Sequence, residues 1–246
     1  MMKKKEMRGE LVCGVHAIVE LLKAKKRKLL TIYTTRPEPK AWRTIEPLLP
    51  KYPVPIQYVN REVLHKIAGT TDHQSIVAFA QPFVFRKKFF DPKREKSLVL
   101  LDGIQDVHNL GAILRSVYCT GFDGVVLCKK QSAPISAAVI KASAGLAEHV
   151  PIYQSPSPQS AVQELKSAGY DLYLTTFDGQ DATIIDYQLP LCIVIGSEAT
   201  GISKEILRSG KHVTLPQRSA DISYNASVAA GILLFWVAKK NNIIVS

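Results

Sequence analysis

Short apolar runs alternate with segments of helical spacing from residue 97 to the end of the chain, and this alternation constrains the fold most. Strands are expected at 98–101, 124–127, 150–153, 171–175, 191–195 and 212–215. Helices are expected between and after them, at 109–120, 134–145, 158–168, 203–208 and 224–239. Regular alternation of this kind predicts an α/β domain in which helices cover both faces of a parallel sheet.

The residues before position 85 predict a second, smaller α/β domain. Strands are expected at 29–34, 53–59 and 76–80, and helices at 12–22, 40–49 and 61–68. Residues 1–10 are expected to form a basic tail, and the segment 85–96 reads as a charged linker. We therefore expect domains at 1–84 and 97–246, joined by that linker.

The positive charge is confined to the first part of the chain. Residues 1–96 hold 21 of the 32 Lys and Arg residues but only 9 of the 21 Asp and Glu residues, so residues 97–246 are close to neutral. This asymmetry favours a polyanionic partner, and nucleic acid before a membrane, because no amphipathic anchor accompanies it. The alternative is a solvated surface that keeps the protein soluble.

Several classes of protein are excluded by simple patterns. No apolar run reaches the roughly 18 residues of a membrane span, and the first residues lack the apolar core of a signal peptide. The four cysteines, Cys13, Cys119, Cys128 and Cys192, form no C-x-x-C pair and have no His at ligand spacing. We therefore expect reduced thiols in a cytoplasmic protein without a metal site.

Three loops at the expected carboxyl ends of strands carry unusual residues, and ligands of open parallel sheets bind at those ends. The loops span 106–115, 193–202 and 215–231. No G-x-G-x-x-G, Walker A or G-x-S-x-G motif is present, so the usual dinucleotide, nucleoside triphosphate and hydrolase sites are excluded. In the first loop, Asn109 is expected to cap the following helix, and Arg115 lies less than two turns further along.

Together the three loops resemble the SpoU (TrmH) family of RNA ribose methyltransferases, within the SPOUT superfamily. The first loop matches the family motif N-x-G-A-x-x-R, and the second matches G-x-E-x-x-G. The third resembles S-L-N-V-S-V-A, with Tyr224 in place of Leu and Ala226 in place of Val. The matching residues are Asn109, Gly111, Ala112, Arg115, Gly196, Glu198, Gly201, Ser223, Asn225, Ser227, Val228 and Ala229.

The resemblance implies a trefoil-knotted C-terminal domain, a homodimer, S-adenosylmethionine as the methyl donor and an RNA 2′-hydroxyl as the acceptor. It implies that Arg115 acts as general base or stabilises the forming alkoxide, and that Glu198 holds Arg115 in an ion pair. Asn109 would orient Arg115 or the ribose, and Ser223 and Asn225 would complete the catalytic group. The residues expected to contact the cofactor are Thr175, Thr176, Gly196, Leu215, Tyr224 and Asn225.

The sequence leaves the RNA substrate undecided between rRNA and tRNA. The basic N-terminal region resembles the ribosomal-protein-like RNA-binding domain of many relatives, which favours a guanosine of large-subunit rRNA over tRNA. A non-catalytic RNA-binding protein that keeps the fold is a further alternative. For Asn109, Ser223 and Asn225, a purely structural role as helix caps is the competing interpretation.

Overall fold

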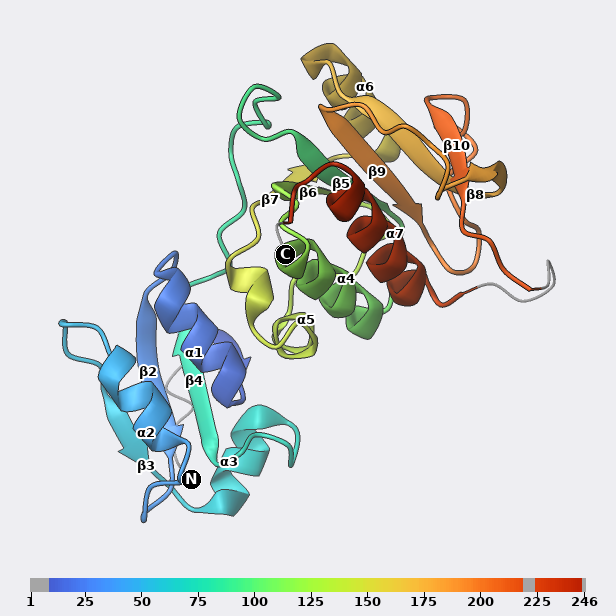
Figure 1. Ribbon diagram of the computed structural model, residues 1–246. Coiled ribbons are helices and arrows are strands. Elements are labelled where there is room, and N and C mark those ends of the chain that lie inside the picture. The colour runs from blue at the N-terminus through green and yellow to red at the C-terminus, as the bar shows by residue number, and fades with distance from the viewer. Residues whose placement is uncertain (1–8, 219–223, 245–246) are drawn as a thin grey trace. The chain divides into compact units, whose positions relative to one another are not determined.

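A computed structural model describes residues 9–218 and 224–244, and the chain divides into two compact units (Figure 1). Unit 1 comprises Met1–Val84 together with Ile135–His149. Unit 2 comprises Phe85–Pro134 and Val150–Ser246. The chain therefore crosses between the units after residues 84, 134 and 149, where the sequence led us to expect a single linker.

Unit 1 is built on a four-stranded mixed sheet in the order β1-β4-β2-β3. Strand β4 is antiparallel to both β1 and β2, whereas β2 and β3 are parallel. All residues of β4 are buried, as its place inside the sheet requires. The strands are β1 (Glu10–Cys13), β2 (Leu29–Thr34), β3 (Ile56–Tyr58) and β4 (Ile76–Ala80). The expected strands 29–34 and 76–80 have the expected bounds, 53–59 is shorter, and β1 was not predicted.

The helices of unit 1 are mostly short. Helix α3 is capped at both ends: Asn60 accepts a hydrogen bond from the Val63 amide at 2.9 Å, and Gly69 ends the helix in the left-handed conformation. The helix expected at 40–49 is divided into a short α-helix and a 3-10 turn that contains Pro47, which lacks an amide hydrogen. The elements are α1 (Val15–Ala24), α2 (Trp42–Ile45), η1 (Glu46–Leu48) and α3 (Arg61–Ala68).

The segment 135–149 contributes α5 (Ala137–Ala142) and η2 (Leu146–Glu148) to unit 1. These elements pack against α1 and β1, so the helix expected at 134–145 belongs to a different unit from the one its sequence position suggested. The approach is close at Gly145, where a Cβ would lie 2.8 Å from the His16 carbonyl oxygen and 2.9 Å from the Ala17 Cα. A side chain at this position would force the two segments apart.

Unit 2 contains a six-stranded sheet in the order β10-β8-β9-β5-β6-β7, with all neighbouring strands parallel. This confirms the fold class expected from the sequence. The central strands β9, β5 and β6 are buried almost throughout, which explains their continuous apolar sequences. The strands are β5 (Ser97–Asp102), β6 (Gly124–Cys128), β7 (Ile152–Ser155), β8 (Asp171–Asp181), β9 (Leu191–Gly196) and β10 (Lys211–Thr214).

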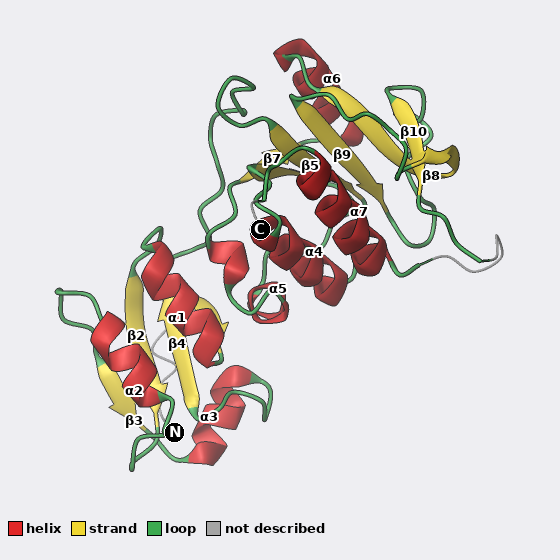
Figure 2. Ribbon diagram, in the orientation of Figure 1, coloured by secondary structure: helices red, strands yellow, loops and turns green. Residues whose placement is uncertain are grey.

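Helices cover both faces of this sheet (Figure 2). Helices α4 (Val107–Cys119) and α7 (Ala226–Lys240) pack against each other and against β6 and β9, respectively. Helix α6 (Pro158–Ala168) packs against β6, β7 and β8. Its buried side chains share a core with strand residues that include Leu98, Leu100 and Val194. The helix expected at 203–208 is a series of turns instead.

The segment expected to be a charged linker packs on unit 2. Phe90 is buried in the same core as Leu98, and the Arg86 guanidinium donates two hydrogen bonds to the Glu95 carboxylate, at 2.6 and 2.9 Å. The Arg86 backbone also forms an isolated parallel β-bridge with Tyr153 of β7. The many charged residues of 85–96 predicted a solvent-exposed linker, but the aromatic residues between them, Phe89 and Phe90, pack on the core of unit 2.

Candidate active site

A cavity of about 860 Å³ opens at the carboxyl ends of β9 and β10 and beside residues 175–178 in the middle of β8, against the start of α7. Its size is in the range of small-molecule sites. The structure brings together here all six residues that were expected to contact the cofactor. They are Thr175, Thr176, Gly196, Leu215, Tyr224 and Asn225. That these residues bind a cofactor stays a prediction.

The loop after β9 is shaped by two glycines. Ser197 and Gly201 exchange backbone hydrogen bonds of 3.0 and 2.9 Å, which closes a tight turn. Gly201 has a φ of +66°, and a Cβ on Gly196 would lie only 2.3 Å from the Gly201 carbonyl carbon. The turn exposes Glu198 at its tip and places it on the wall of the cavity.

The two threonines in the middle of β8 differ in how their hydroxyl groups are satisfied. Thr175 Oγ1 donates to the Val194 carbonyl oxygen at 2.9 Å, whereas Thr176 Oγ1 is buried and has no hydrogen-bond partner among the described residues. Buried hydroxyl groups are normally paired. An unpaired hydroxyl on a cavity wall is suited to a polar ligand, so this cavity fits a small molecule with hydrogen-bonding groups.

Helix α4 begins beside the cavity and contributes Asn109. Asp106, not Asn109, caps the helix, because its carboxylate accepts hydrogen bonds from the His108 and Asn109 amides at 2.6 and 3.2 Å. This corrects the expected cap and leaves the Asn109 side chain free for another contact. Asn109 Nδ2 donates to Glu198 Oε1. The pair forms because β5 and β9 are neighbours, with Asp102 opposite Gly196.

Arg115 lies apart from these residues. It is exposed, does not line the cavity, and makes no hydrogen bond or ion pair within the described part of the chain, so the expected ion pair with Glu198 is absent. Six residues of helix rotate a side chain by about 600°, so Arg115 projects about 120° away from Asn109 and about 9 Å further along the axis. Among the side chains that the structure describes, Glu198 therefore hydrogen-bonds to Asn109 and not to Arg115.

The third loop is described only in part. Asn225 caps α7, because its Oδ1 accepts hydrogen bonds from the Ser227 amide at 2.9 Å and the Val228 amide at 3.4 Å. Asn225 thus has the structural role that was the alternative to catalysis, and it also lines the cavity. Ser223 lies outside the described residues.

Sequence reasoning missed Phe177 and Asp178, which also line the cavity. The expected strand stopped at residue 175, but β8 continues to Asp181 because Val213 and Thr214 of β10 pair with Gln180 and Asp181 after a bulge. Phe177 is 71% exposed at this position. The available signal in the sequence was the phenylalanine that directly follows the two threonines expected to contact the cofactor.

The cysteines offer no reactive thiol at the site. Cys13, Cys128 and Cys192 are buried, and Cys119 is exposed near the end of α4. Burial raises the pKa of the Cys128 thiol to about 12, so it stays protonated and poorly nucleophilic. Among residues 9–218 and 224–244, no three His, Cys, Asp or Glu side chains are grouped to hold a metal ion, and no helix could span a membrane.

Comparison with known proteins gives a family for each part of the chain. Residues 96–235 match the SpoU rRNA Methylase family, and residues 11–85 match the substrate-binding domain of RNA 2′-O ribose methyltransferases. A protein named as a TrmH family tRNA/rRNA methyltransferase, YacO of Bacillus subtilis strain 168, is 32% identical over 243 residues. That match covers 95% of this chain and 96% of YacO.

Solved structures agree with the fold. The AdoMet-bound rRNA methyltransferase of Sinorhizobium meliloti superposes with a TM-score of 0.80 and 23% identity, over 99% of this chain and 90% of that one. The SpoU methyltransferase AviRb of Streptomyces viridochromogenes, in complex with AdoMet, gives a TM-score of 0.75 and 21% identity over 94% and 90% of the two chains. At these identities the likeness establishes the architecture.

Proposed function

We propose, because this chain belongs to the SpoU rRNA methylase family, that it uses S-adenosylmethionine to methylate a guanosine of large-subunit rRNA at the ribose 2′-hydroxyl. The observation that carries the proposal is the cavity lined by β8 and by the carboxyl ends of β9 and β10, with the Asn109–Glu198 pair beside it. Its unpaired Thr176 hydroxyl supports a polar small-molecule ligand there.

Methyl transfer to a hydroxyl group requires the protein to bind the methyl donor, to orient the acceptor ribose and to remove the hydroxyl proton. S-adenosylmethionine, when bound, supplies an electrophilic methyl group. Thr176 of β8 and the segments around Gly196 and Leu215 line the cavity and would hold the donor. Asn109, fixed in place by Glu198, orients the acceptor ribose by hydrogen bonds, so positioning supplies much of the rate.

The third requirement is removal of the 2′-hydroxyl proton and stabilisation of the alkoxide that forms, for which we assign Arg115 one of two roles. As general base, a neutral Arg115 guanidine would take the proton and become a guanidinium; as a guanidinium from the start, it would stabilise the alkoxide while the proton passes to water. Arg115 faces away from the cavity of its own chain. It shares an exposed face of α4 with Tyr118, three residues further on, where i and i+3 side chains are neighbours. A second protein copy on this face would place Arg115 at a subunit interface.

The same region supports the homodimer. Helix α7 packs beside α4 and leaves large apolar side chains exposed, with Phe235 at 54%. Its exposed apolar residues are Val228, Ile232, Phe235 and Trp236. Apolar patches of this kind mark interaction surfaces, and a twofold dimer pairs one patch with its own copy. We propose that the α4–α7 face forms the dimer and that Arg115 acts in the partner's site.

Transfer of radiolabelled methyl from S-adenosylmethionine to total rRNA and, separately, to tRNA tests the proposal. Nuclease mapping of the label should find a 2′-O-methyl guanosine in large-subunit rRNA. Label in tRNA alone would replace the substrate and keep the reaction. Failure to bind S-adenosylmethionine would favour the second candidate, a non-catalytic RNA-binding protein.

A further inference from the structure

The loop after β6, residues 129–132, lies next to the candidate active site. Strands β5 and β6 are parallel neighbours with Leu101 opposite Leu127, so the loops that follow them start about 5 Å apart. The Ala133 amide donates to the Ile104 carbonyl oxygen at 2.8 Å. The 129–132 loop therefore contacts the segment that leads into α4 and Asn109.

This loop is held in one conformation. At its start, the Lys129 amide donates to the Ser155 carbonyl oxygen at 2.8 Å, and at its end Ala133 is bonded to Ile104. Gln131 between them adopts a left-handed backbone with a φ of +65°. Non-glycine residues rarely take this conformation, and where they do the strain is often associated with function.

The loop carries two positive charges that no group in the described part of the chain neutralises. Lys129 and Lys130 are exposed, and neither ammonium group makes a hydrogen bond or an ion pair with any residue that the structure describes. The nearby carboxylates are already engaged, since Asp102 accepts from Ser203 and Asp106 caps α4. Arg115, Lys129 and Lys130 are the only Lys or Arg residues from 97 to 134.

Two exposed ammonium groups on neighbouring residues form a set of donors that suits a phosphate oxygen. The cavity rim nearby carries the carboxylates of Glu198 and Asp178, which would repel a polyanion unless cations lie beside them.

We propose that the 129–132 loop binds a backbone phosphate of the RNA beside the acceptor nucleotide. The proposal rests on the proposed function and extends it, because it adds an RNA contact on unit 2, whereas the charge asymmetry placed RNA binding in the N-terminal region. The loop holds the strand so that the ribose meets Asn109. Lys129 and Lys130 are positioning residues and take no part in proton or methyl transfer.

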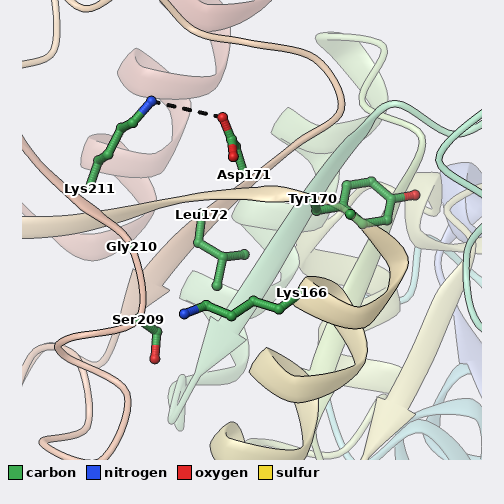
Figure 3. Close-up of a pocket in the computed structure, with 8 residues that line it drawn as sticks. Lys166, Tyr170, Asp171, Leu172, Ser209, Gly210 and Lys211 are labelled. Atoms are coloured by element: carbon green, nitrogen blue, oxygen red, sulfur yellow. Dashed lines mark ion pairs between the residues drawn. The ribbon is translucent and has the colours of Figure 1, made fainter.

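Two lysines at the amino ends of the strands, opposite the carboxyl ends where the 129–132 loop lies, provide a matched control. There, at the amino ends of β8 and β10, a cavity of about 340 Å³ is lined by Lys166 and Lys211 (Figure 3). Lys211 Nζ lies 3.8 Å from Asp171 Oδ2, and the C-terminal end of α6 borders the cavity with its negative dipole end. Removing these two lysines changes the charge of unit 2 by the same amount as removing Lys129 and Lys130, and leaves the residues at the carboxyl ends of the strands unchanged.

The test compares the full-length double variant K129A/K130A with the control K166A/K211A and the charge-conserving K129R/K130R. For rRNA that the wild type methylates, K129A/K130A should raise KM about tenfold and lower the slope of log Kd against log[salt] by about 1. Affinity for S-adenosylmethionine should be unchanged, and K129R/K130R should restore most of the RNA affinity. Circular dichroism confirms that each variant is folded.

Three outcomes would overturn the proposal. An unchanged KM and salt slope in K129A/K130A, or an equal change in K166A/K211A, would remove the loop from RNA binding. A selective loss of S-adenosylmethionine affinity would assign the loop to the cofactor. Absence of methyl transfer by the wild type to rRNA and tRNA alike would instead refute the proposed function, on which this proposal depends.

Discussion

The buried ion pair between Arg27 and Glu148 makes the segment 135–149 essential to unit 1. Both side chains are 2% exposed, and Arg27 Nε and Nη2 donate to the Glu148 carboxylate at 3.1 and 2.5 Å. Arg27 Nη1 also donates to Glu10 at 2.9 Å and to the Gln81 carbonyl oxygen at 3.1 Å. One guanidinium therefore joins β1, the end of β4 and η2.

Removing one partner of such a pair strands a buried charge, which costs about 3–5 kcal/mol. Replacing both partners by apolar side chains of similar volume is often nearly neutral. We therefore expect Arg27→Met to lower the free energy of unfolding by about 3 kcal/mol or more, and Glu148→Leu to lower it by less, because Glu10 still pairs with Arg27. The double variant should lose much less than the sum, although Glu10 and Gln81 would each lose a hydrogen bond.

Tryptophan fluorescence can follow unit 1 by itself. Trp42 is buried in unit 1 and Trp236 lies on α7 of unit 2, and the chain has no other tryptophan. In a Trp236→Phe background, urea unfolding reports the transition around Trp42. Single variants that cost less than about 1 kcal/mol, or a double variant that costs the sum of the singles, would refute the assignment of this pair as the link between 135–149 and the rest of unit 1.

The remaining predictions concern the site, the dimer and pH. Arg115→Ala should lower the rate of methyl transfer by about 10²–10⁴-fold with unchanged cofactor affinity, and retained turnover would exclude Arg115 from the mechanism. Thr176→Val should weaken S-adenosylmethionine binding about fivefold in a calorimetric titration, since one hydrogen bond is worth about 1 kcal/mol; equal affinity would show that no ligand meets this hydroxyl. Phe235→Asp should convert a dimer into a monomer in light scattering, whereas Ile184→Asp, another exposed apolar position, should not. Burial, together with the neighbouring His65 and Arg61, lowers the pKa of His73 in the folded protein. As the pH falls, His73 is therefore protonated in the unfolded chain at a higher pH than in the folded protein. The free energy of unfolding of unit 1 should therefore fall as the pH drops below about 6.5, and His73→Gln should flatten that dependence.

The discontinuity of unit 1 also changes how its role in RNA binding is tested. Deleting residues 1–84 removes Arg27 and leaves the Glu148 carboxylate, together with the apolar side of α5, without the groups that cover it. Charge-neutralising substitutions on the exposed surface of unit 1 are therefore a better probe than truncation.

Much of the local structure follows from the sequence because it depends on neighbouring residues. The strands 29–34 and 76–80 and the helix 61–68 have the expected bounds, since alternation, periodicity and the Asn60 and Gly69 caps are local signals. The three family motifs likewise predicted which loops would meet. The trefoil knot and the roles of individual site residues stay predictions.

The sequence by itself determined the α/β class and the parallel sheet of unit 2, because apolar periodicity decides which face of each element is buried. It also indicated that the three loops cluster, because the loops carry the family motifs and follow strands of one parallel sheet. Only the tertiary structure decided that 135–149 belongs to unit 1, that Asp106 caps α4 and that Glu198 pairs with Asn109 while Arg115 faces outward. These features depend on which partner lies opposite a side chain in space. Competition between such partners, as when Asp106 frees Asn109 for Glu198, is settled by the packing of segments that are distant in the chain.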